Sequence, residues 1–247
     1  MSALLAATAV TYRVGTAELV GGVDIVVNAG ELVAVVGPNG AGKSTLVSLL
    51  AGDLEPTAGA VHLAGEDVAR LDVRELAQLR AVLGQNPLAE VPFTVADVVA
   101  MGGYPDGAEV DNAAVMAAMD VAHLADRVVA SLSGGEHTRV ALARVLFQGT
   151  PLVLLDEPLA ALDVAHQERV MRYLRGVAAE GRGVLAVLHD LNAAAAHADR
   201  FVLMANSRIA AQGTAEEVLD GEVLSNVYGH PMTVTRIGRR LVVLPAD

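Results

Sequence analysis

Short apolar runs alternate along this chain with helix-like stretches. The apolar runs are rich in Val, Leu and Ala and lie at residues 31–36, 81–85, 152–156, 184–188 and 201–204. Such runs are typical of strands that are buried on both faces, as in a parallel sheet covered by helices. Helices are predicted between and after them, at residues 46–51, 72–80, 164–175 and 191–198. The alternation predicts an α/β fold built on a mostly parallel sheet.

Three parts of the chain depart from this alternation. Near the N-terminus, short strands are predicted at residues 4–12, 23–27 and 59–65, and we expect an antiparallel β-subdomain there. From residue 86 to 148 the pattern is helical, with predicted helices at residues 95–101, 111–119, 121–125 and 134–147. The tail after residue 214 is predicted to hold two short helices and a hairpin of residues 233–237 and 241–244.

We therefore predict a single domain that spans residues 1–247. Residues 1–85 and 149–247 are expected to build the α/β core with its small C-terminal tail, and residues 86–148 an inserted helical subdomain. The sequence shows no internal repeat and no linker long enough to divide independent domains.

The strand at residues 31–36 leads into a glycine-rich segment that fits the pattern G-x-x-x-x-G-K-[ST] completely. Between a strand and a helix, this pattern is typical of a loop whose backbone N–H groups surround a nucleotide phosphate. Lys43 is expected to reach the β- and γ-phosphates, and the Ser44 hydroxyl to hold Mg²⁺. The competing interpretation is a plain glycine turn before a helix. The predicted nucleotide-binding residues are Gly37, Pro38, Asn39, Gly40, Ala41, Gly42, Lys43, Ser44 and Thr45.

Composition favours a phosphate-binding role for Lys43, because it is the only lysine among the 17 basic residues. The net charge of −12 and the lack of a basic stretch outside residues 236–240 argue against a nucleic-acid partner. The absence of cysteine excludes disulfides and thiolate metal sites. No apolar run is long enough to cross a bilayer, and the N-terminus lacks an export signal. We expect a cytoplasmic protein that reaches membranes only through a partner.

Polar residues follow three of the predicted buried strands, namely Asp156 with Glu157, His189 and Gln85. In parallel sheets, ligand chemistry gathers at the carboxyl ends of the strands. We expect Asp156 to hold Mg²⁺ through water and Glu157 to polarise an attacking water as a general base. His189 could touch the γ-phosphate, although a lone histidine is more often structural. The Gln85 amide oxygen is a candidate metal ligand, with a plain turn residue as the alternative.

A second glycine-containing helix start lies at residues 132–136, where Ser133 is a good N-cap. A capped helix with a flexible entry is the simple interpretation. The alternative is a second phosphate site. Because the loop at residues 37–45 is complete without it, such a site could serve the nucleotide of a second copy of the chain.

The order of these motifs resembles that of ABC-transporter ATPase subunits over nearly the whole chain. The resemblance implies a P-loop ATPase that uses ATP and Mg²⁺, with two copies sandwiching the nucleotide. It implies that Tyr12 stacks on adenine and that Gln85 is a lever to the permease. Glu157 would be the general base and His189 the switch histidine. Contacts to the other copy would come from Ser133, Gly134, Gly135 and Glu136, and from a dimer loop of Ala161, Leu162 and Asp163.

Residues 92–95, 163–167, 188–192 and 227–231 are similar to those of ATPases from bacterial heme, iron-siderophore and cobalamin importers. The Ala-His-Gln at residues 165–167 looks most like the heme-importer members. The resemblance implies two permease subunits and an extracytoplasmic heme-binding protein as partners, at the cytoplasmic face of the cell membrane. The sequence departs from the family at residues 137–138 and 159–160. These departures put in doubt contacts across the dimer, but they remove no catalytic group.

Other interpretations remain open at this point. An iron-siderophore or cobalamin importer is one alternative, and a soluble ABC protein of DNA repair or translation is another. A P-loop kinase or GTPase is a third, but it would give residues 132–136 no role. Phe93 is either a core residue or part of a groove with Val91 and Tyr104 for a short permease helix.

Overall fold

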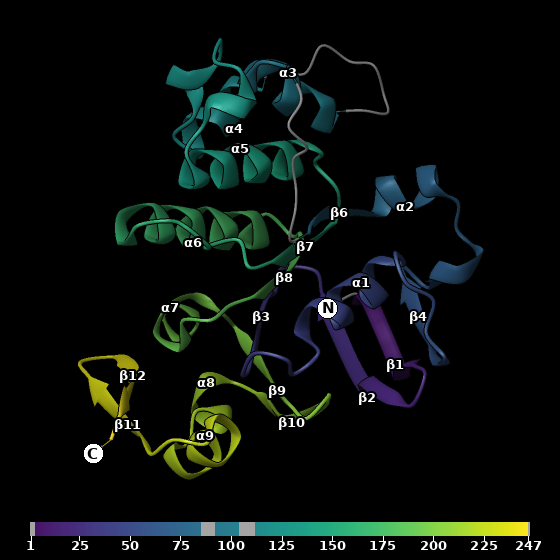
Figure 1. The fold of residues 1–247 in the computed structure, drawn as a ribbon, viewed down its shortest axis with the longest axis vertical. Helices are drawn as coiled ribbons and strands as arrows, with labels where there is room; N and C mark the ends of the chain where they lie inside the picture. Colours follow the sequence, from purple (N-terminus) through teal and green to yellow (C-terminus); the bar gives the residue numbers. More distant parts are fainter. Residues whose placement is uncertain (1–2, 85–91, 104–111, 247) are drawn as a thin grey trace.

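The computed structural model describes residues 3–84, 92–103 and 112–246. Two sheets and the helices around them form the α/β architecture that the sequence predicts (Figure 1). Gln85, Val91 and Tyr104 lie outside the described residues, so the structure does not test the predictions made for them.

The larger sheet has six strands in the order β10-β9-β3-β8-β7-β6. Their bounds are Leu32–Val36 (β3), Arg80–Leu83 (β6), Leu152–Asp156 (β7), Gly183–Val187 (β8), Arg200–Ala205 (β9) and Arg208–Gly213 (β10). All neighbours are parallel except β10, which pairs antiparallel with β9. The sequence analysis missed β10, because this half-exposed edge strand has small and polar side chains instead of an apolar run.

Alternate residues of the central strands belong to two separate hydrophobic cores, one on each face of the sheet. In β3, Leu32, Ala34 and Val36 belong to a core shared with the helices on one face, whereas Val33 and Val35 belong to a core on the other face. Every residue of β3, β7 and β8 is buried. Burial on both faces explains why these strands carry near-continuous apolar sequence.

The smaller sheet is antiparallel, in the order β2-β1-β4-β5. Its strands are Ala3–Val14 (β1), Ala17–Asn28 (β2), Ala58–Leu63 (β4) and Glu66–Asp67 (β5). It packs through the second core on helix α1 (Lys43–Ala51), which therefore lies between the two sheets. The predicted strands at residues 4–12 and 23–27 were too short. The register between β1 and β2 is irregular, and the two strands continue to pair past Tyr12 as far as the turn at Gly15.

The outer face of the large sheet is covered by α5 (Gly134–Phe147), α6 (Val164–Ala179) and α7 (Leu191–His197). α3 (Val95–Ala100) and α4 (Ala113–Ala118) pack on α5, whereas α2 (Val73–Leu79) packs in the second core. The stretch predicted as a helix at residues 121–125 is a single 3-10 turn, Ala122–Leu124. α3, α4 and α5 gather at one end of the molecule in Figure 1. No helix among the described residues is both long and apolar enough to cross a membrane.

The C-terminal residues form a small unit at the opposite end from α3–α5 (Figure 1). It contains α8 (Ala215–Val218), α9 (Gly221–Tyr228) and a hairpin of β11 (Met232–Ile237) and β12 (Arg240–Pro245). The two helices and the hairpin agree with the prediction for the tail. Leu224 and Val243 anchor the unit in the core that lies under the helices.

Candidate functional site

The loop between β3 and α1 needs glycine at defined positions. Gly37, Gly40 and Gly42 have φ angles of +145°, +79° and +94°, which side-chain-bearing residues rarely adopt. A Cβ on Gly37 would lie 2.1 Å from the Met204 carbonyl oxygen, and one on Gly42 would lie 2.3 Å from the Leu19 carbonyl oxygen. The close approach of neighbouring strands therefore fixes the path of this loop.

Lys43 is held inside the loop, with 5% of its surface exposed. Its Nζ donates hydrogen bonds to the carbonyls of Gly37 and Pro38, each at 2.8 Å. Burial lowers the pKa of Lys43, and the nearby carboxylates of Glu157 and Asp156 oppose that shift. α1 begins at Lys43 without a side-chain cap from Gly42, which leaves first-turn N–H groups for an anion.

Asp156 ends β7 beside the start of α1 and is 5% exposed. Burial raises the pKa of Asp156, and a hydrogen bond with Ser44 acts in the opposite direction. Its Oδ1 is buried without a hydrogen-bond partner. A hydroxyl beside an unsatisfied carboxylate oxygen fits Mg²⁺, which prefers oxygen ligands and keeps several waters. In the described part of the chain, no cluster of three or more His, Asp and Glu offers a competing metal site.

Glu157 follows Asp156 with φ of +53°, in a left-handed conformation that costs about 1–3 kcal/mol for a non-glycine residue. Its Oε1 lies 2.7 Å from Nε2 of His189, which follows β8. Both side chains are partly exposed and line one cavity of about 490 Å³, a size suited to a small-molecule ligand. The same cavity is lined by Leu19, Asn39, Gly40, Gly42, Lys43, Ser44 and Thr45.

The structure thus brings together most of the residues that the sequence assigned to one nucleotide. Lys43 and Ser44 face the same cavity as Glu157 and His189, with Asp156 in contact with Ser44. Parallel pairing explains this placement, because β7 and β8 are neighbours and end at the same edge of the sheet as β3.

Residues 133–136 do not line this cavity. Ser133 caps α5 in a capping box, in which its hydroxyl lies 2.9 Å from a Glu136 carboxylate oxygen. Arg127 holds the other Glu136 oxygen at 3.2 Å. A Cβ on Gly135 would lie 2.9 Å from the Ala161 carbonyl oxygen, so the start of α5 packs closely against the dimer loop. The two segments that were assigned to the other copy are therefore neighbours.

Side chains of α6 fix the dimer loop. Asp163 caps α6 by accepting a bond from the His166 N–H at 2.9 Å. Gln167 donates to the Leu162 carbonyl at 3.1 Å. Ala161 has φ of +60°, a further left-handed conformation in this loop. These bonds tie the loop to the first turns of α6, and Ala161 lines a cavity together with Glu157 and His189.

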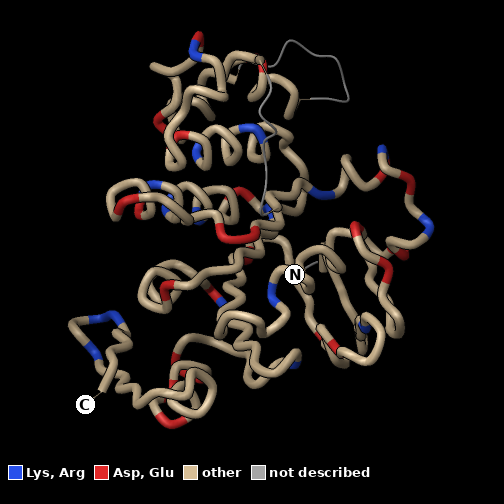
Figure 2. The backbone as a smooth tube through the Cα atoms, viewed as in Figure 1, with Lys and Arg blue, Asp and Glu red and all other residues tan. Residues whose placement is uncertain are grey.

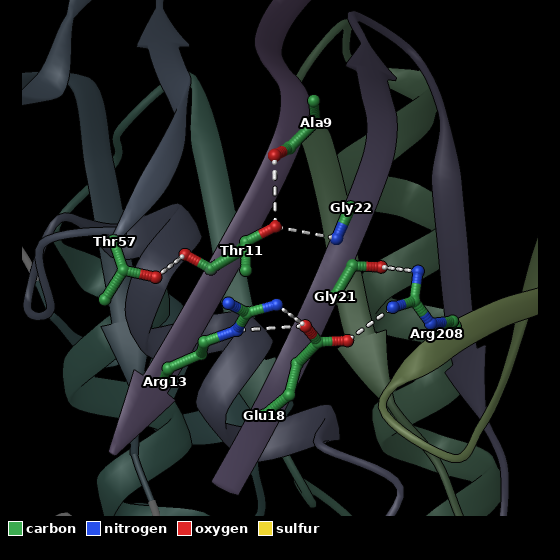
Figure 3. A network of polar contacts seen from close by, with 8 residues as sticks. All are labelled: Ala9, Thr11, Arg13, Glu18, Gly21, Gly22, Thr57 and Arg208. Carbon is green, nitrogen blue, oxygen red and sulfur yellow. Dashed lines mark hydrogen bonds and ion pairs between the residues drawn. The ribbon is translucent and has the colours of Figure 1, made fainter. Parts of the chain in front are cut away.

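Leu19 lines the cavity, and the sequence analysis did not find it, because an ordinary leucine in a strand carries no signal of its role. Neighbouring residues hold its strand in place (Figure 3): Arg208 of β10 contacts both the Glu18 carboxylate and the Gly21 carbonyl. Tyr12 is part-buried against the core of the antiparallel sheet and is not among the residues that line the cavity. Its predicted stacking on adenine stays a prediction.

Comparison with known proteins gives an independent view of the chain. A family model described as ABC transporter matches residues 20–160. The chain is 52% identical over 219 residues to a hemin import ATP-binding protein of Nocardia farcinica, covering 86% of this chain and 76% of that protein. A hemin import ATP-binding protein of Streptomyces coelicolor is 49% identical over 250 residues, covering 97% and 89% of the two chains. A solved dimeric cassette of a bacterial ABC transporter has a TM-score of 0.76 at 26% identity, over 85% of this chain and 98% of that one.

Proposed function

This chain belongs to the ABC transporter family as an ATP-hydrolysing subunit, and from that premise we propose that it powers hemin import. The observation that carries the hydrolytic role is the contact between Glu157 and His189, 2.7 Å apart in one cavity with Lys43. The hemin assignment is supported by identities of 49–52% to two hemin import ATP-binding proteins.

The side chains around the cavity suit distinct parts of the reaction. Two of the three Nζ donors of Lys43 are bound to carbonyls, which leaves one for a phosphate oxygen of ATP. Glu157 accepts the proton of the attacking water, and His189 keeps the Glu157 carboxylate in place. Ser44 and Asp156 would hold Mg²⁺, which neutralises phosphate charge when bound. Gln85 would complete this set as the link to the permease.

The hydrolytic unit is proposed to contain two copies of the chain. Ser133, Gly134 and Gly135 lie outside the cavity of their own chain, at the start of a helix that is suited to bind an anion. The dimer loop lies next to them, since a Cβ on Gly135 would lie 2.9 Å from the Ala161 carbonyl oxygen, and we propose that it contacts the same second copy. The partner copy's γ-phosphate is the proposed ligand of this helix start.

The proposed permease contact involves residues 86–148, which we propose form a helical subdomain at the cytoplasmic face of the membrane. Phe93 is 43% exposed and Val128 is 41% exposed, so Phe93 is not a core residue. The Val129 N–H donates to the Phe93 carbonyl at 3.0 Å, which fixes the two segments side by side. An exposed apolar pair on a rigid backbone fits a short apolar permease helix.

We expect Phe93→Ala to leave the melting temperature and ATP affinity of the isolated subunit nearly unchanged, because the ring is only half-buried. The same change should weaken assembly with the permease, measured by copurification. Phe201→Ala is the matched control: that ring is fully buried, and its loss should cost about 3–5 kcal/mol of stability. A large drop in melting temperature for Phe93→Ala, or normal assembly, would refute the docking role.

The transport assignment is tested by reconstituting the chain with its permease and binding protein in lipid. We expect the hemin-loaded binding protein to stimulate ATP hydrolysis. Stimulation only by a siderophore-loaded or cobalamin-loaded binding protein would move the chain to one of those importers. Failure of the chain to copurify with any polytopic membrane protein would contradict the transport role itself.

A further inference from the structure

The C-terminal unit touches the nucleotide site at two places that the proposed chemistry does not use. One contact is made by the hairpin and the other by α9. The hairpin contacts the helix that follows His189, and α9 contacts the loop that begins at Gly37. The positions of both segments affect the nucleotide site.

The hairpin contact runs through Asn192, in the first turn of α7. Its carboxamide pairs with the backbone of Val243 in β12: Oδ1 accepts from the Val243 N–H at 2.8 Å, and Nδ2 donates to the Val243 carbonyl at 3.2 Å. Val243 is 5% exposed, whereas Asn192 itself lies at the surface, so these bonds are partly shielded from water. Asp190 caps the same turn by accepting from the Asn192 N–H at 2.7 Å. Both ends of the turn after His189 are therefore fixed.

The helix contact runs through Tyr228, the last residue of α9. Its part-buried ring packs against the large core that lies under the helices. The Gly37 backbone acts on its hydroxyl as a hydrogen-bond donor, which lowers the pKa of the phenol against the effect of burial. Burial raises the pKa of Tyr228 to about 12, so the phenol stays neutral near pH 7 and its oxygen is available as an acceptor.

α9 and the hairpin act as one body because Ser225 joins them. The Ser225 hydroxyl donates to the Gly221 carbonyl within α9 at 2.5 Å and accepts from the Met232 N–H of β11 at 2.8 Å. The hairpin strands then pair in unbroken register from Met232 to Ile237. A body that holds Gly37 at one point and Asn192 at another fixes the distance between the phosphate loop and the helix of His189.

We propose that residues 221–246 are a positioning clamp for the nucleotide site, in which Tyr228 orients the phosphate loop and the Asn192–Val243 pair orients His189. The clamp's residues do not line the nucleotide cavity, so they are positioning residues. The proposal rests on the hydrolytic role proposed above for Glu157 and His189. Small displacements in such a site cost large factors in rate, which makes the effect measurable.

The hairpin's charge does not supply an alternative role in nucleotide binding. The Arg positions, coloured blue in Figure 2, lie on the hairpin itself, whereas Asn192 and Tyr228 act through neutral groups. The clamp therefore predicts effects with little dependence on ionic strength.

The test uses the full-length chain and steady-state ATP hydrolysis. Asn192→Ala should lower kcat about tenfold with KM for ATP nearly unchanged, because it frees His189 and leaves the phosphate loop in place. Asn112→Ala is the matched control, since Asn112 also bonds a backbone carbonyl but lies in the helical end of the molecule. In a His189→Ala background, Asn192→Ala should cause no further loss of kcat.

Tyr228→Phe should raise KM for ATP about threefold to tenfold while kcat changes little, because only the bond to the phosphate loop is lost. Tyr173→Phe is the matched control, as Tyr173 is also part-buried against the same core. If Asn192→Ala does not fold, Asn192→Asp serves instead, since it keeps the acceptor for Val243.

Equal loss of kcat from Asn192→Ala with and without His189 would overturn the clamp, as would unchanged kinetics in both Asn192→Ala and Tyr228→Phe. Those outcomes leave the hydrolytic role standing as long as Glu157→Gln is inactive. An active Glu157→Gln chain would instead remove the hydrolytic role on which the clamp rests.

Discussion

Glu157→Gln is expected to lower ATP hydrolysis by about 10²–10⁴-fold, the range by which a positioned general base accelerates a reaction. The amide keeps the shape of the side chain and its reach toward His189, but it removes the charge and the basicity. ATP binding should survive, because Lys43, Ser44 and the glycine loop are untouched. The chain should therefore accumulate as a closed dimer with ATP, which size-exclusion chromatography detects.

Glu55→Gln is the control for this experiment, because it makes the same chemical change on an exposed side chain outside the cavity. It should hydrolyse ATP at the normal rate. Near-normal hydrolysis by Glu157→Gln would show that Glu157 is not the general base, whether or not the closed dimer accumulates.

The phosphate loop could be predicted from the sequence because its constraints are local. The glycines sit where φ is positive or where a Cβ would strike Met204 or Leu19, and the strand before them is an apolar run. The meeting of Asp156, Glu157 and His189 was also predictable, because parallel strands end at one edge of the sheet.

Features that depend on distant partners could not be predicted. β10 is recognisable only through its pairing with β9, and the full length of β1 only through its bulged register with β2. Leu19 lines the cavity, and its own strand is held on both sides of it by Arg208, which is far along the chain. The contacts of Tyr228 and Asn192 likewise join segments that are remote in sequence.

Complementation between two inactive variants is expected because Ser133 lies outside the cavity of its own chain. Lys43→Ala removes the phosphate contact, and Ser133→Arg places a bulky side chain where the other copy's nucleotide would bind. Each variant alone should be inactive as a homodimer, because both composite sites then carry a lesion. In a mixed dimer the two lesions fall in the same composite site, and the other site is intact.

We infer that each hydrolytic site combines Lys43 of one copy with Ser133 of the other, and mixing these two chains is the decisive test of that arrangement. Equal amounts should give mixed dimers as half of the population, and ATP hydrolysis should recover to about one quarter of the wild-type rate. The two chains carry different affinity tags, so that mixed assembly is proven in the same sample, and melting temperatures confirm that Ser133→Arg folds. Sites built within one chain predict no recovery, because each chain then carries its own lesion. Hydrolysis that stays at the level of the homodimers, with mixed assembly proven, would contradict the claim.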